Sequence, residues 1–111
     1  MKPDDIQETI FNEIKEKLYS HFGTKLVKVI LFGSFARGDY ESDSDVDILL
    51  VVNDNYLQAH DEYLSELTIS LLNKTDLYFA FYTESEKFFD ENKYRLPFLK
   101  NVVEEGKVIY G

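Results

Sequence analysis

Two pairs of residues in the middle of the chain have the types and spacing that phosphate chemistry requires. Gly33-Ser34 is followed by ten residues and then by Asp45-Val46-Asp47. Carboxylates at positions i and i+2 of a strand share one face, with Cβ atoms about 7 Å apart. Such like charges repel each other unless a cation bridges them or one is protonated. The pair therefore suits Mg²⁺ or Mn²⁺ completed by substrate phosphates, although an Asp-x-Asp alone also fits an ordinary solvated strand start.

The Gly-Ser pair has the features of a phosphate-binding turn. Gly33 has no side chain, so a phosphate can approach the backbone closely. If Ser34 begins a helical turn, its hydroxyl and the N–H groups of that turn point at the phosphate. Arg37 lies within the next turn and can add a charge-assisted hydrogen bond. Because Gly-Ser after a strand is also common as a plain turn, the pair is informative only together with the acids.

A third acid, Asp76, begins the next apolar segment, for which we expect a strand over 75–82. If that strand lies beside the one that carries Asp45 and Asp47, the three carboxylates can gather at one rim of the sheet. Three acids around two metal ions are a usual arrangement for in-line phosphoryl or nucleotidyl transfer. As a single residue, Asp76 also fits an ordinary strand start.

The apolar periodicity predicts the elements that must position these acids. A strand over 25–32 ends at Gly33, and a strand over 45–52 begins with the acids. The polar loop between them is too short for a crossover helix, so we expect them to pair antiparallel. A helix over 56–72 is long enough for a crossover to the third strand. The predicted fold is α/β (α+β), a small mixed sheet with helices on one face.

The remaining segments read as further helices and a tail. A helix is expected over 4–22, with Asp4 and Gln7 as a capping box. A second capping box at Thr83 and Glu86 predicts a short helix after it, and a last helix is expected near 97–105. The segment over 108–110 is expected to be a short strand or a packed tail. His60 lies inside the apolar stripe of the helix over 56–72. It is predicted to be packed or hydrogen-bonded, with metal binding or proton transfer as the alternative.

The composition limits the class of protein. A chain of 111 residues with 44% hydrophobic residues allows one domain over 1–111 with an adequate core. The chain has no cysteine, which excludes disulfides and thiolate sites, and shows neither a signal peptide nor a membrane span, so we expect a cytoplasmic protein. The net charge of −9 disfavours direct binding to nucleic acid or anionic membrane. Phosphate chemistry on such a chain would depend on metal cations.

The combined motif resembles the signature of the minimal nucleotidyltransferases of the DNA polymerase β-like superfamily. The resemblance rests on Gly33-Ser34, Ala36-Arg37-Gly38, Ser44 before Asp45-x-Asp47, and Lys74-Thr75-Asp76-Leu77, with a similar C-terminal end. It implies that Asp45, Asp47 and Asp76 are catalytic and ligate two Mg²⁺ ions. It also implies that the nucleotide, ATP, is bound by Gly33, Ser34, Arg37 and Ser44.

Minimal members of this family resemble the antitoxin halves of two-gene toxin–antitoxin modules. The resemblance implies a HEPN ribonuclease toxin as partner and transfer of AMP from ATP to a tyrosine of that toxin. Two alternatives stay open: an antitoxin that only masks its toxin, and a nucleotidyltransferase with a small-molecule acceptor in a homodimer cleft. A masking protein would not need the Gly-Ser pair and all three carboxylates together.

Overall fold

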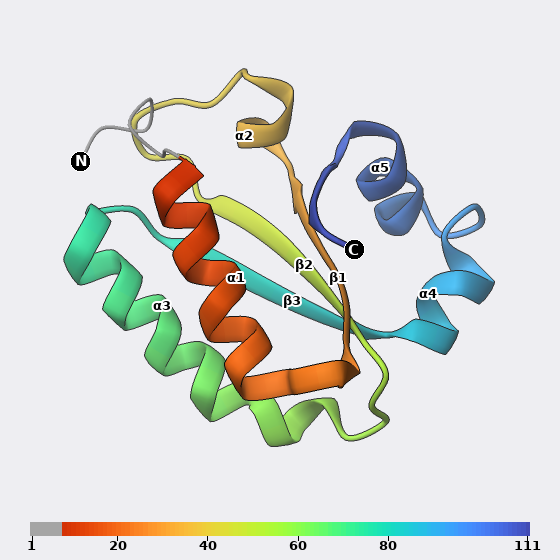
Figure 1. The fold of residues 1–111 in the computed structure, drawn as a ribbon. Helices are drawn as coiled ribbons and strands as arrows, with labels where there is room; N and C mark the ends of the chain where they lie inside the picture. Colours follow the sequence, from red (N-terminus) through yellow and green to blue (C-terminus); the bar gives the residue numbers. More distant parts are fainter. Residues whose placement is uncertain (1–7) are drawn as a thin grey trace.

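The computed structural model describes residues 8–111 (Figure 1). A four-stranded sheet carries helices on both of its faces. The elements are α1 (Glu8–Phe22), η2 (Gly23–Lys25), β1 (Leu26–Phe32), α2 (Ser34–Arg37), β2 (Val46–Val52), η3 (Leu57–His60), α3 (Asp61–Thr75), β3 (Phe79–Ser85), α4 (Glu86–Asn92), α5 (Pro97–Glu105) and β4 (Lys107–Tyr110).

The strand order is β3-β2-β1-β4. β1 pairs antiparallel with β2, and β2 pairs parallel with β3. Both predictions about strand direction are therefore confirmed, because the loop over 38–45 turns the chain back and α3 provides the crossover. β4 pairs antiparallel with β1, so the C-terminal segment is a strand rather than a packed tail. β3 and β4 form the two edges of the sheet.

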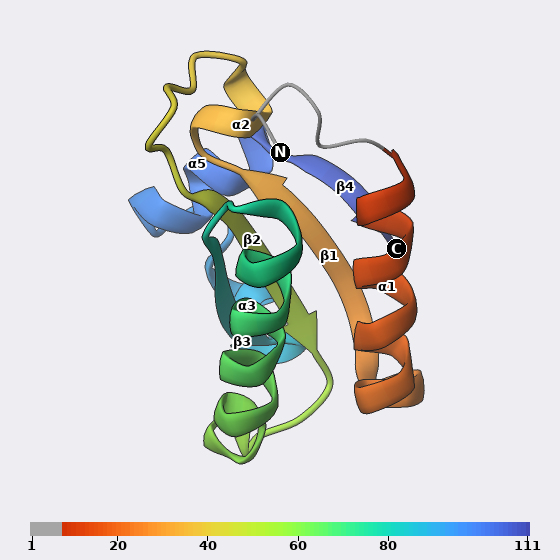
Figure 2. The same cartoon turned by 90° about the vertical axis from the view of Figure 1, so that its left-hand side faces the viewer.

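Helices cover both faces of the sheet, which corrects the prediction of helices on one face only. α1 and α3 pack against one face, where Ile14, Leu18 and Leu71 meet Ile48 and other core residues. α4 and α5 pack against the opposite face, where Phe89, Leu99 and Val102 form a second cluster with residues of β1 and β2. Figures 1 and 2 show α1 and α3 side by side, away from α4 and α5. The strand β2 is apolar on both faces because each face has its own core.

The helical periodicity correctly identifies the buried face of each long helix. Ile10, Ile14, Leu18 and Phe22 of α1 are buried, as are Leu64, Leu67, Leu71 and Thr75 of α3. Complete burial of one such aliphatic side chain stabilises the fold by about 1.5–3 kcal/mol. These two stripes thus fix the helices on the sheet and leave the strand ends free to carry polar residues. The predicted capping residues Asp4 and Gln7 lie outside the described residues.

The third strand begins later than predicted. α3 continues to Thr75, whose hydroxyl donates to the carbonyl of Leu71 at 2.7 Å and accepts from the N–H of Leu77 at 3.1 Å. Asp76 follows as the C-cap in the left-handed conformation, with φ of 62°. A Gly is the usual residue at such a helix end, so its absence here hides the boundary. The capping box predicted at Thr83 and Glu86 is wrong, because β3 continues to Ser85, and Ser85 caps α4 by accepting from the N–H of Phe88 at 3.2 Å.

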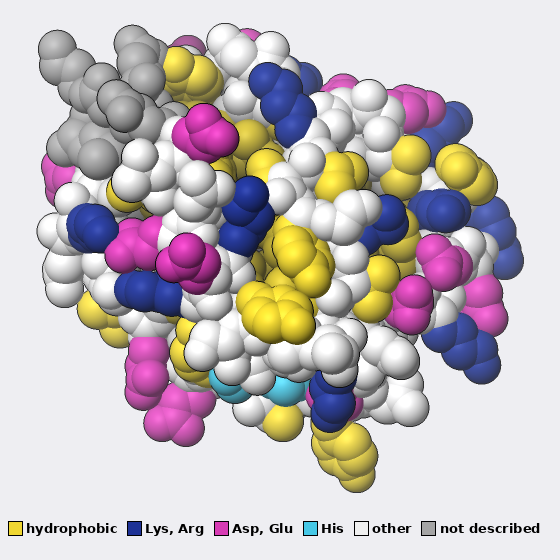
Figure 3. Space-filling view, in the orientation of Figure 1, with side chains coloured by type: hydrophobic (Ala, Val, Ile, Leu, Met, Phe, Trp, Pro, Cys, Tyr) yellow, Lys and Arg dark blue, Asp and Glu magenta, His cyan; other side chains and the backbone are white. Residues whose placement is uncertain are grey.

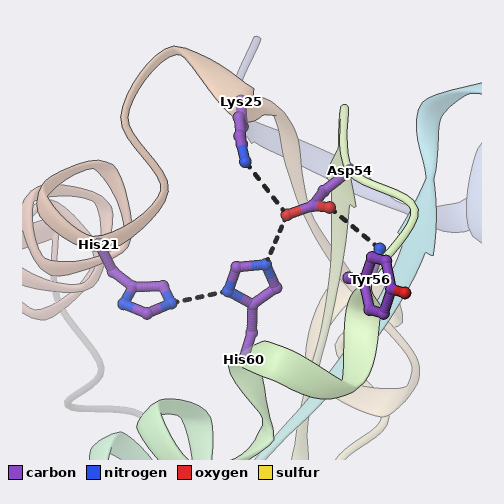
Figure 4. Close-up of polar contacts among 5 residues, drawn as sticks. All are labelled: His21, Lys25, Asp54, Tyr56 and His60. Carbon is purple, nitrogen blue, oxygen red and sulfur yellow. Dashed lines mark hydrogen bonds and ion pairs between the residues drawn. The ribbon is translucent and has the colours of Figure 1, made fainter.

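A histidine network joins α1 to the chain that follows β2 (Figure 4). His21 Nε2 lies 2.8 Å from His60 Nδ1, and His60 Nε2 lies 2.9 Å from Asp54 Oδ2. Asp54 also accepts from the backbone N–H of Tyr56 at 3.0 Å and pairs with Lys25 at 3.4 Å. These bonds lower the pKa of Asp54 to about 2, with the Tyr56 amide as the largest cause. His60 is therefore a packed and hydrogen-bonded residue, as predicted.

Figure 3 shows the face that carries α1 and α3. Hydrophobic side chains gather in the middle of this face, and Lys and Arg are interspersed with Asp and Glu around them. None of the described helices is long and apolar enough to cross a membrane.

Candidate active site

Gly33 and Asp47 are in direct contact at one end of the sheet. The register of β1 with β2 places Asp47 opposite Phe32, the residue that precedes Gly33. A Cβ atom added to Gly33 would lie 2.5 Å from Asp47 Oδ2, closer than real Cβ contacts allow. Gly33 also has a φ of +76°, a conformation that side chains disfavour. The two motifs predicted from the sequence therefore form one site, in which glycine makes room for a carboxylate.

Ser34 begins the short helix α2 directly beside this contact. The N–H of Arg37 donates to the Gly33 carbonyl at 3.1 Å, and the N–H groups of Gly38 and Asp39 donate to the Ser34 carbonyl at 2.8 and 3.1 Å. Gly38, with φ of +84°, ends the turn. The predicted helical turn after Gly33 is thus present.

The loop that leads from α2 to the acids is held by local contacts. The rings of Phe35 and Tyr40 stack with centroids 4.4 Å apart. The hydroxyl of Ser44 accepts from the backbone N–H of Glu41 at 2.8 Å, and the N–H of Ser44 donates to the Glu41 carbonyl at 3.1 Å. Ser44 therefore shapes the turn that delivers the exposed Asp45 to the start of β2.

The two acids differ in environment. Asp45 is exposed just before β2, whereas Asp47 is half-buried within the strand. Burial, followed by the negative charge of Asp45, raises the pKa of Asp47 above its ordinary value. A hydrogen bond from Tyr82 and the charge of Arg37 act in the opposite direction. The site thus holds two close carboxylates whose repulsion a divalent cation would relieve.

Arg37 is held by two carboxylates. Its Nε lies 3.2 Å from Asp39 Oδ2, and its Nη1 lies 3.2 Å from Glu105 Oε2 at the end of α5. These hydrogen bonds raise its pKa. The pairs tie α2 to α5, so an incoming phosphate would compete with Asp39 and Glu105 for this guanidinium.

Asp76 lies on a different element from the other two acids. It is exposed at the C-cap of α3, three residues before β3 begins. Among residues 8–111, no group of three or more Asp, Glu, His or Cys side chains lies close enough to hold a metal ion. Gly33, Ser34, Arg37, Asp45 and Asp47 thus come from the ends of β1 and β2 and the segment between them, whereas Asp76 comes from the end of α3.

Tyr82 of β3 is a site residue that the sequence reasoning missed. Its hydroxyl bonds to Asp47, and burial and the nearby acids raise its own pKa. Its ring belongs to an aromatic cluster with Phe32 and Phe98, with centroids 5.4–5.9 Å apart. The signal was available in principle, because parallel pairing with Asp47 opposite Ala80 places Tyr82 on the same face as Asp47.

Comparison with known proteins agrees with the class that this fold and site define. The nucleotidyltransferase domain family matches residues 10–110, and the chain belongs to this family of enzymes. It is 38% identical over 104 residues to "Putative protein adenylyltransferase MJ0604" of Methanocaldococcus jannaschii. This alignment covers 94% of this chain and 98% of that protein. It is 49% identical over 45 residues to "Putative protein adenylyltransferase MJ0141" of the same organism, covering 40% and 46% of the two chains.

Solved structures with the same fold come from toxin–antitoxin complexes. One is a toxin–antitoxin crystal structure with AMP-PNP, with a TM-score of 0.58 and 23% identity, covering 91% of this chain and 73% of that one. Another is tri-AMPylated Shewanella oneidensis HEPN toxin in complex with MNT antitoxin, with a TM-score of 0.56 and 22% identity, covering 96% and 73%. At these identities the similarity concerns the fold.

Proposed function

We propose that this chain is a Mg²⁺-dependent protein adenylyltransferase that transfers AMP from ATP to a tyrosine hydroxyl of a HEPN-type toxin, and so acts as an antitoxin. The proposed catalytic activity is supported by the contact between Gly33 and Asp47, which places the Gly-Ser turn beside the acid pair. The choice of AMP is supported by the relative named as a protein adenylyltransferase, which this chain matches over nearly its whole length. The toxin partner is supported by the structural neighbours and by the motif.

The acids and the turn have separate roles in this proposal. Asp45 and Asp47 fit Mg²⁺, because they offer two hard oxygen ligands and leave the remaining positions to water and phosphate. Bound Mg²⁺ would neutralise charge on the triphosphate and activate the attacking hydroxyl. Gly33 and Ser34 would hold the terminal phosphates. Arg37 and Ser44 are proposed as further nucleotide contacts, and Asp76 as a third metal ligand.

The transfer step is an in-line displacement. The tyrosine oxygen of the acceptor forms a bond to the α-phosphorus of ATP, and the bond from that phosphorus to the bridging oxygen of the β-phosphate breaks. Pyrophosphate leaves with the electron pair, and the phenolic proton passes to solvent or to a carboxylate. The chain itself supplies mainly position and electrostatics, as is usual for this chemistry.

Mass measurement of the acceptor tests the proposal. The chain is incubated with ATP, Mg²⁺ and a HEPN-type toxin as acceptor, and the acceptor is weighed by mass spectrometry. We expect a gain of one or more AMP units, with the rate reduced about a hundredfold or more in Asp45→Asn and Asp47→Asn. Asp43→Asn is the matched control, because Asp43 is an exposed acid of the same loop outside the pair.

Two outcomes would contradict the proposal. One is an acceptor that gains no mass with any nucleotide. The other is an Asp45→Asn, Asp47→Asn double variant that protects cells from the toxin as well as the wild-type chain does, since this would indicate masking. Asp76→Asn tests the third ligand separately, because a full rate in this variant would remove Asp76 from the site.

A further inference from the structure

A groove runs along the outer edge of β3 and ends at Asp45. It has a volume of about 690 Å³ and lies between β3 and α3. Six consecutive residues over 78–83 line it, together with Asp61, Ser65 and Thr68 of α3. Because neighbouring side chains of a strand point to opposite faces, a groove lined by consecutive residues contacts the backbone edge itself. The groove therefore exposes the edge of the sheet.

The direction of the β3 backbone groups follows from one hydrogen bond. The N–H of Val46 donates to the Tyr78 carbonyl at 2.9 Å, so Tyr78 directs its carbonyl toward β2. The direction alternates along a strand, so Ala80 and Tyr82 also face β2, whereas Phe79, Phe81 and Thr83 face outward. Thr68 confirms this arrangement, because its hydroxyl donates to the Phe79 carbonyl at 3.1 Å from the outer side.

The outward groups of Phe81 and Thr83 have no hydrogen-bond partner among the described residues. β3 reads Phe-Ala-Phe-Tyr-Thr-Glu-Ser and contains neither the Lys nor the Pro that often protects an edge strand. A free edge of this kind is the surface on which an extended peptide adds a strand.

Charge and position indicate the occupant. The charged side chains that line the groove, Asp45 and Asp61, are both acidic. They favour a basic segment and disfavour a second copy of this chain, whose net charge is also −9. Since the groove ends at Asp45, a segment in it would lead directly to the proposed transfer site. Exposed Tyr78, Tyr82 and Ile69 offer it apolar contacts.

We propose that the free edge of β3, with the groove beside α3, binds an extended, basic segment of the acceptor protein as an added strand and thereby brings the acceptor hydroxyl to Asp45. The inference rests on the proposed function. It specifies how the acceptor is recognised, and nucleotide binding does not depend on it.

Amide exchange measured by NMR tests the added strand directly. The probe is a synthetic peptide of alternating Lys and Val with one central Tyr, and its control is the same peptide with Glu in place of Lys. We expect the basic peptide to slow exchange of the Phe81 and Thr83 amides, while Ala80 and Tyr82, already bonded to β2, change little. Unchanged exchange at Phe81 and Thr83 under saturating peptide would overturn the inference, as would a chain that already dimerises through β3.

Variants test the same surface in the transfer reaction. Asp61→Lys should raise KM for the acceptor protein about tenfold without changing ATP binding measured by calorimetry. Glu62→Lys makes the same charge change one residue away and outside the groove, so it should behave as wild type. Thr83→Pro removes an outward amide and should raise KM about fivefold relative to Thr83→Val, which keeps the amide.

The results separate this inference from the proposed function. If Asp61→Lys and folded Thr83→Pro transfer AMP with the wild-type KM, the edge is not the acceptor site, although the chain is still an adenylyltransferase. If Asp47→Asn transfers AMP at the full rate, the proposed function fails. Peptide protection at Phe81 and Thr83 would then still show that the edge binds a strand.

Discussion

The Asp47 carboxylate occupies the space that a side chain on Gly33 would need, with Oδ2 2.5 Å from the position of a Gly33 Cβ atom. Position 33 therefore needs glycine for two reasons: the Asp47 carboxylate fills the space of a side chain, and the backbone turn has a positive φ. It also distinguishes two effects that a Gly→Ala change can have, loss of a left-handed conformation and a steric clash.

Gly33→Ala should therefore remove transfer activity, because the added methyl displaces Asp47. Gly38→Ala is the matched control, since Gly38 also has a positive φ of 84° but no atom within 4 Å of its added Cβ. Both variants should lose stability from the backbone conformation, about 1 kcal/mol for Gly38 in the αL region and up to about 3 kcal/mol for Gly33, whose ψ of −156° lies in a region that is almost restricted to glycine. Initial rates of AMP transfer and thermal melts measure the two effects, and equal rates in the two variants would contradict the steric explanation.

Tyr82→Phe should move the acidic limb of the pH–rate profile to higher pH. The Tyr82 hydroxyl lowers the pKa of Asp47, so its removal lets that pKa rise further. Asp47 must be ionised to bind a cation, and activity falls as the pH drops through its pKa. The profile of kcat/KM measures the shift. The control is Tyr78→Phe, which removes a hydroxyl on the same face just before β3. An unchanged acidic limb of the pH–rate profile in Tyr82→Phe would show that the hydrogen bond from Tyr82 to Asp47 has no effect.

Asp47→Asn should raise the melting temperature at neutral pH while it removes activity. The folded-state pKa of Asp47 is above its ordinary value, so the folded protein binds this proton more tightly than the unfolded chain. The ionised carboxylate is then destabilising above the folded pKa, and the penalty disappears below the unfolded pKa. The difference between variant and wild type should shrink on acidification.

Added Mg²⁺ gives the complementary measurement. A ligand that binds only the folded state raises its stability, so MgCl₂ with AMP-PNP should raise the melting temperature of the wild type more than that of Asp47→Asn. An equal rise in both would contradict metal binding at this acid.

Asp54 should control acid stability at the opposite end of the sheet. Its pKa of about 2 lies below the ordinary value of 3.8, so its contribution is present above pH 3.8 and is lost as the pH falls toward about 2. Asp54→Asn should thus show a smaller loss of stability than wild type over this range. Urea unfolding between pH 5 and pH 2 measures it, with Asp43→Asn as control, and equal slopes for wild type and Asp54→Asn would exclude the role.

The sequence was most informative where buried runs are long and continuous. The runs that became β1 and β2 predict strands, and the short loop between them predicts antiparallel pairing. The sequence predicts too early a start for β3 because Asp76, not Gly, adopts the left-handed cap of α3. The sequence predicts the helices α4 and α5 but not their place on the second face, because an apolar strand such as β2 does not reveal which helix covers which side.

The same limits apply to the site. Spacing alone correctly anticipated that Gly33-Ser34 and the acid pair lie together, since β1 and β2 are adjacent in the sheet. It could not give the contact between Tyr82 and Asp47, which depends on the register of β2 with β3. The roles of the predicted site residues remain predictions for the experiments above.

The open edge of β3 has a consequence for the chain when no partner is present. An unprotected strand edge promotes association between copies, and this edge has no local Lys or Pro to prevent it. The surplus of 21 acidic over 12 basic residues makes copies repel one another over about 8 Å at physiological ionic strength. Solubility of the unbound chain would then depend on its overall charge, and concentrated salt should favour its self-association.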